Sequence, residues 1–79
     1  MESKGGRVEP KVAKVAVGRN IKAQRKRRDL TQEMLAHRIG MHPVEVGRAE
    51  RGTRDMRVST VVKLARGLDV SPMELFRDV

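Results

Sequence analysis

The chain has 79 residues, which is enough for one compact domain with a small core and too few for a two-domain enzyme. It has no cysteine, no stretch of about 18 apolar residues and no signal-peptide pattern at its start, so we expect a soluble cytoplasmic protein without disulfides or membrane spans. Its 18 lysines and arginines against 10 acidic residues give a net charge of +8, which favours a polyanionic partner, and a single aromatic residue, Phe76, favours duplex DNA over single strands.

The N-terminal part of the chain predicts an arm followed by a long helix. Residues 1–9 mix glycines and charges without periodicity, which is typical of a flexible arm ahead of a domain over residues 10–79. The first helix is predicted over residues 11–28, with Pro10 at its start and Asp29 at its exit, because Asp tolerates left-handed backbone geometry. Its apolar residues recur at spacings of three and four: Val12, Ala16, Val17 and Ile21.

Two shorter helices separated by a tight turn are predicted next. The second helix should run from Gln32 to Arg38, with Thr31 as its N-cap and with Gly40 ending it at positive φ. The third should run from Pro43 to Arg51 and end at Gly52. The apolar residues expected to face the core are Leu35, Ala36, Ile39, Val46 and Ala49.

The C-terminal part predicts two more helices after a loop over residues 53–57. The fourth helix has an apolar stripe, expected to be buried, that ends before Asp69 and comprises Val58, Val61, Val62, Leu64, Ala65 and Leu68. Ser71 and Glu74 predict a capping box at the start of a short fifth helix over residues 72–77. No segment has the alternation of a strand, so the expected fold class is all-α with five helices.

One ordered set of residues resembles the lambda-repressor-like helix-turn-helix family, also called the XRE or Cro/C1 family. The set comprises Leu30-Thr31-Gln32, Leu35-Ala36, Gly40, Val46 and Glu50-Arg51-Gly52. The resemblance covers residues 17–76 and implies a five-helix DNA-binding domain with its helix-turn-helix at helices two and three. It also implies a homodimer on a partly palindromic operator. Stand-alone domains of this length are similar to phage repressors, to controller proteins of restriction-modification systems and to some antitoxins.

The resemblance places the third helix in the major groove and implies which residues read bases. The candidates are His42, Pro43, Val44, Gly47 and Arg48. Arg48 can pair with guanine O6 and N7, and Val44 can pack on a thymine methyl group. Pro43 and Gly47 replace polar residues that the family often has there, which predicts a site read partly through DNA shape.

Other positions of the resemblance imply contacts to phosphates, a structural ion pair and a dimer contact. Phosphate contacts are expected from the start of the second helix and from the loop before the fourth: Gln32, Thr53, Arg54 and Arg57. Arg25 and Glu50 are expected to pair and to tie the groove helix to the first helix. The apolar C-terminal residues Leu75, Phe76 and Val79 are expected to form the dimer contact, with closing the core as the alternative.

Glu45 has the wrong charge for a helix that lies against DNA. Phosphates should repel it unless it accepts a hydrogen bond from cytosine N4, or turns away and orients Arg48, its i+3 neighbour. Its contact with DNA is therefore left open.

The sequence favours no catalytic or metal site, and no cofactor is expected. His37 and His42 are separated by the turn at Gly40 and lack the helical spacing and acidic partner of a zinc site. We therefore expect a sequence-specific, double-stranded DNA-binding transcription regulator that is not an enzyme. The alternatives are an antitoxin-like protein that neutralises a partner protein, and an RNA-binding module built on the basic run Arg25 to Arg28.

Overall fold

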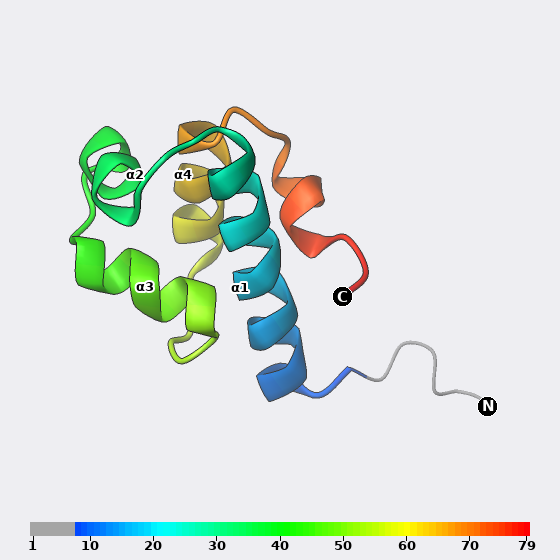
Figure 1. Cartoon of the computed structure of the whole chain (residues 1–79). Helices are drawn as coiled ribbons and strands as arrows, with labels where there is room; N and C mark the ends of the chain where they lie inside the picture. Colours follow the sequence, from blue (N-terminus) through cyan, green and yellow to red (C-terminus); the bar gives the residue numbers. More distant parts are fainter. Residues whose placement is uncertain (1–7) are drawn as a thin grey trace.

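The computed structural model describes residues 8–79, and helices account for most of this part of the chain (Figure 1). The elements are α1 (Pro10–Arg27), α2 (Gln32–Ile39), α3 (Pro43–Arg51), α4 (Val58–Gly67) and the 3-10 helix η1 (Pro72–Phe76). Residues 8–79 contain no strand, so the all-α prediction is confirmed. Within the same residues, no helix is long and apolar enough to cross a membrane. The predicted arm lies outside the described residues except for Val8 and Glu9, which are exposed and not helical.

The ends of the helices follow the predicted caps. The Thr31 side chain accepts a hydrogen bond from the Met34 N–H at 3.0 Å, which satisfies one of the free donors at the start of α2. Gly40 and Gly52 end α2 and α3 at φ values of 69° and 72°, where a side chain would be strained. Two aspartates adopt the same region of backbone after α1 and α4: Asp29 (φ 54°) and Asp69 (φ 58°).

The predicted fifth helix is a 3-10 turn, so its expected α-helical capping box is wrong. The Ser71 hydroxyl accepts from the Met73 N–H at 3.3 Å, while the Glu74 N–H donates to the Ser71 carbonyl at 2.9 Å. The segment is also tied to α1 by two side-chain hydrogen bonds. Asn20 Nδ2 donates to the carbonyl of Leu75 at 3.0 Å and to that of Arg77 at 2.8 Å.

The core lies where α1 and α4 meet the other helices. Figure 1 shows α1 between α3 and η1, and α2 packs on both α3 and α4. The largest fully buried side chains are Ile21, Leu35, Val46, Leu64, Leu68 and Leu75. Three residues of the predicted apolar stripes are exposed: Val12 (59%), Val58 (80%) and Val62 (37%). Val12 and Val58 lie in the first turns of their helices. The apolar spacing extends into these turns, but no neighbouring helix covers the two side chains.

Gly18 allows α1 and α3 to cross closely. A Cβ atom at Gly18 would overlap the backbone carbonyl oxygens of Ala49 and Glu50 in the last turn of α3. Backbone atoms cannot rotate away as a side chain can, so the position of α3 against α1 requires a glycine here.

Candidate nucleic-acid interface

A buried ion pair fixes α3 to α1. Arg25 Nε donates to Glu50 Oε2, and Arg25 Nη2 donates to Glu50 Oε1 at 3.0 Å. The two side chains are only 9% and 3% exposed. The hydrogen bond with Glu50 raises the pKa of the Arg25 guanidinium, and this effect outweighs the lowering by burial. Arg25 Nη1 also donates to the Leu30 carbonyl at 2.7 Å, so this guanidinium is committed to the scaffold and not to DNA.

Gln32 joins the start of α2 to the same ion pair. Its Nε2 donates to Glu50 Oε1 at 3.0 Å, and the side chain is half-buried. The first-turn N–H groups of Gln32 and Glu33 have no partner inside the helix, which is the arrangement that suits a phosphate. The side chain of Gln32 therefore links α2 to α3, while the backbone N–H groups at the start of α2 are free to donate.

The start and outer face of α3 present the predicted base-reading residues. His42 has the extended backbone of an N-cap, but its side chain makes no capping hydrogen bond. His42, Pro43, Val44 and Arg48 are exposed, and Val44 keeps 58% of its surface free. Val44 and Arg48 are four residues apart and share one face of the helix, so a methyl group and a guanidinium are presented side by side.

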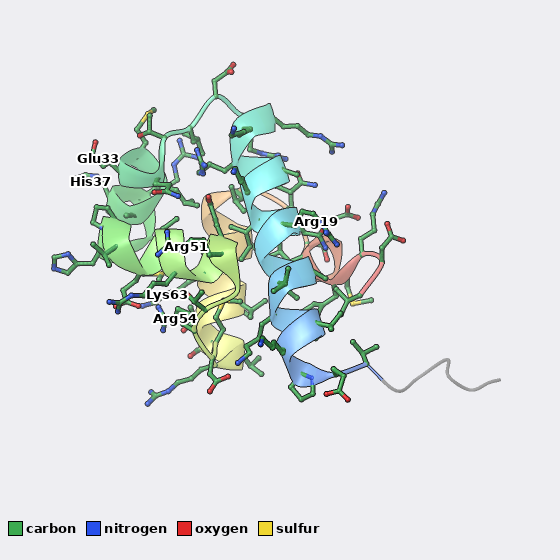
Figure 2. The ribbon with its side chains drawn as sticks, turned by 60° about the horizontal axis from the view of Figure 1, so that its bottom comes forward. Arg19, Glu33, His37, Arg51, Arg54 and Lys63 are labelled. Carbon is green, nitrogen blue, oxygen red and sulfur yellow. The ribbon has the colours of Figure 1, made fainter. Side chains whose placement is uncertain are left out.

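Gly47, unlike the other predicted readers, is buried, because Arg51 folds back over it. A Cβ atom at Gly47 would lie 3.2 Å from Arg51 Nη1 and 3.5 Å from Gln32 Oε1. Figure 2 shows Arg51 on the face of α3 that is turned toward the viewer, with Glu33 and His37 on the neighbouring α2. The group that a ligand would meet here is the Arg51 guanidinium. Sequence reasoning missed Arg51, although its spacing of four residues from Gly47 was a usable signal.

Glu45 bridges two arginines. Its Oε2 lies 3.3 Å from Arg48 Nη1 on the next turn of α3, and its Oε1 lies 2.8 Å from Arg54 Nη1 in the following loop. The sequence left open whether Glu45 contacts DNA or orients Arg48, and in the structure without DNA its carboxylate pairs with Arg48. The additional pairing with Arg54 was not predicted, because it depends on how the loop folds back onto α3.

The loop over residues 53–57 is tied to the helices on both sides. The Thr53 hydroxyl donates to the Arg48 carbonyl at 3.3 Å, at the end of α3. Lys14 of α1 pairs with Asp55 at 2.9 Å. Arg57 is exposed and precedes α4 as its N-cap. The structure therefore holds Arg54 against α3 through Glu45, while Arg57 lies at the start of α4.

The three C-terminal apolar residues divide between core and surface. Leu75 was expected at the dimer contact, but it is fully buried and closes the core instead. Phe76 and Val79 are 49% and 37% exposed. Phe76 lies at an apolar groove between α1, α4 and η1, whose lining includes Val17, Met56, Val58 and Val62.

Comparison with known proteins finds helix-turn-helix regulators. The helix-turn-helix family HTH_3 matches residues 21–75. The chain is 34% identical over 62 residues to the control protein C.SmaI of Serratia marcescens, covering 78% of this chain and 74% of that protein. The crystal structure of the restriction-modification controller protein C.AhdI from Aeromonas hydrophila is 39% identical, with a TM-score of 0.77 over 78% of this chain and 94% of that one. An HTH_3 family transcriptional regulator from Vibrio cholerae is 28% identical, with a TM-score of 0.81 over 86% of this chain and 38% of that one.

Proposed function

The chain belongs to the helix-turn-helix family HTH_3, and on this premise we propose that it is a homodimeric transcription regulator that reads a partly palindromic operator in duplex DNA. The similarity to C.SmaI and C.AhdI supports a regulator of the restriction-modification control type. The observation that carries the proposal is the construction of α3. Its outer face presents Val44, Arg48 and Arg51, while the buried Arg25–Glu50 pair holds it rigidly on the scaffold.

Base recognition is assigned to the exposed face of α3. Arg48 can donate two hydrogen bonds to a guanine, which is worth about 1–3 kcal/mol of discrimination, and Val44 can contact a thymine methyl group. Pro43 and His42 shape the start of the helix without a comparable donor pattern, which leaves room for readout of DNA shape. Arg51 adds a second guanidinium to this face.

Phosphate recognition is assigned to groups on both sides of α3. The backbone at Gln32 belongs to α2, which precedes α3 in the chain, and Thr53, Arg54 and Arg57 belong to the loop that follows α3. These contacts set the register of the protein on the duplex and do not depend on base sequence.

The proposal is tested by selection of bound fragments from random duplexes. We expect enrichment of a two-fold motif, because each subunit of a dimer would place one α3 in the major groove, about 34 Å from the other. Selection that enriches no motif would refute sequence-specific recognition.

Two arginine substitutions separate base reading from phosphate binding. Arg48→Ala should relax the preference at one base pair in each half-site and cost about 1–3 kcal/mol on the selected operator. Arg54→Ala should weaken binding to all duplexes alike and reduce the slope of log affinity against log salt by about one. Both effects are measured by titrating operator and unrelated duplexes over a salt series. Identical behaviour of the two variants would show that Arg48 is not a base reader.

The dimer contact is assigned to Phe76 and Val79, with the apolar groove beside Phe76 receiving the second copy. Phe76→Asp should convert the dimer to a monomer, because a carboxylate would be buried in an apolar contact. Molecular mass in solution checks this. Met34→Asp is the matched control, since Met34 is 50% exposed, close to the 49% of Phe76, but lies on α2 away from the groove.

A wild-type protein that is monomeric at all concentrations would contradict the dimer. Tight co-purification of that monomer with a different protein would instead favour the antitoxin-like alternative.

A further inference from the structure

We propose that Glu45 is a specificity-determining positioning residue: it holds Arg48 away from DNA phosphates and gives it up to a guanine at a matching base pair, while Arg54 stays paired with the carboxylate. The proposal rests on the proposed function, because it assumes that α3 reads duplex DNA. A carboxylate on a helix that faces DNA would otherwise only be repelled by the phosphates.

The geometry gives each carboxylate oxygen of Glu45 its own arginine. Oε1 lies 2.8 Å from Arg54 Nη1, and Oε2 lies 3.3 Å from Arg48 Nη1. The Arg54 side chain is 26% exposed and that of Arg48 is 53% exposed, so Arg54 is the more firmly held of the two. Arg48 is therefore the partner that can leave, and Arg54 the one that stays.

The loop is built so that Arg54 does not swing freely. Thr53 is bonded to the Arg48 carbonyl, and Asp55 is paired with Lys14. Arg54 itself donates from Nε to the Asp55 carbonyl at 3.3 Å. Residues on both sides of Arg54 are thus anchored, which keeps its guanidinium over Glu45.

This arrangement affects matching and unrelated duplexes differently. On a matching site, Arg48 exchanges Glu45 for two hydrogen bonds with a guanine, while Arg54 keeps Nη1 on the carboxylate and offers its other N–H groups to a phosphate. On an unrelated duplex Arg48 finds only phosphates. Moving it there gives up the pairing with Glu45 without two base hydrogen bonds in return, and leaves a less neutralised carboxylate beside the phosphate backbone, which repels it. Glu45 should therefore weaken non-specific binding more than specific binding.

The test compares Glu45→Gln with Glu33→Gln on the full chain. Both substitutions remove one negative charge from the helix-turn-helix, but Glu33 is an exposed residue in the first turn of α2. Affinities are measured on the selected operator and on an unrelated duplex over a salt series. We expect Glu45→Gln to tighten binding to the unrelated duplex about tenfold and to steepen its salt slope by about one. The operator affinity should change less than about threefold, so the ratio of the two affinities falls. Glu33→Gln should leave that ratio unchanged.

Two further variants distinguish the pairing of Glu45 with its arginines from the effect of its negative charge alone. Glu45→Asp keeps the charge but shortens the side chain, so it should also lower the affinity ratio. In the Arg48→Gln background, Glu45→Gln should lose most of its effect on the unrelated duplex, because the guanidinium that it would release is absent. Thermal melting of each variant verifies that it is folded.

The outcomes distinguish the inference from the function on which it rests. If the wild type selects a motif but Glu45→Gln behaves like Glu33→Gln, the role of Glu45 is overturned and the proposed function stands. If the wild type selects no motif, the proposed function fails and the role of Glu45 fails with it.

Discussion

Glu50→Ala is expected to lower the free energy of unfolding by about 3–5 kcal/mol, because it leaves the Arg25 guanidinium buried without its counter-charge. We expect the cost of breaking a fully buried pair because the side chains of Arg25 and Glu50 are only 9% and 3% exposed. Gln32 would lose its acceptor at the same time. For a domain of this size the melting temperature should fall by about 15 °C or more. Thermal and urea denaturation followed by circular dichroism measure both quantities.

The control for this prediction is Glu33→Ala, a glutamate on the same helix-turn-helix that is exposed. It should cost less than about 1 kcal/mol. The double substitution Arg25→Met with Glu50→Met should recover most of the loss, because it removes both charges together. A cost of less than about 1 kcal/mol for Glu50→Ala would contradict a buried pair.

Gly18→Ala is expected to destabilise the protein by about 2–3 kcal/mol, although alanine is the better helix former. In an unobstructed helix the same change would stabilise by about 1 kcal/mol. The sign is reversed here because the new Cβ atom would overlap the carbonyl oxygens of Ala49 and Glu50. To relieve the overlap, α3 must move away from α1, so operator affinity should fall together with stability.

Ala23→Gly provides the reference for helix propensity within α1. Ala23 is exposed, so this change should cost only about 1 kcal/mol and leave operator affinity unchanged. Urea denaturation and operator titration of both variants check the prediction. A stabilised Gly18→Ala protein would show that α1 and α3 do not approach each other as closely as the structure has them.

The helix boundaries could be predicted because they depend on local chemistry. Thr31 caps α2 with its own side chain, and Gly40 and Gly52 end their helices at positive φ. The fifth helix was predicted less well: its carbonyls at Leu75 and Arg77 accept hydrogen bonds from Asn20, which is distant in the sequence and gives no local signal. Val12 and Val58 belong to the predicted apolar stripes but are exposed. Apolar periodicity identifies which face of a helix is apolar, but it does not show how far along that face a neighbouring helix extends.

One contact within the candidate site was predicted from the sequence, but the others were not. The Arg25–Glu50 pair was inferred from the family resemblance, and the structure contains it. Gly47 was taken as part of the exposed reading face, whereas Arg51 covers it. The direction in which a long, flexible arginine folds depends on which neighbours leave space for it, and sequence spacing does not reveal this.

The amino-acid sequence by itself determined an all-α helix-turn-helix domain with a basic surface, because caps, glycines at turns, apolar spacing and charge are local properties. The tertiary structure alone decided which charges are available to DNA. It buries Arg25 against Glu50, lays Arg51 over Gly47 and joins Arg48 to Arg54 through Glu45. These pairings depend on how α1, α3 and the loop meet in space, and the free energy of an ion pair depends on its distance and burial.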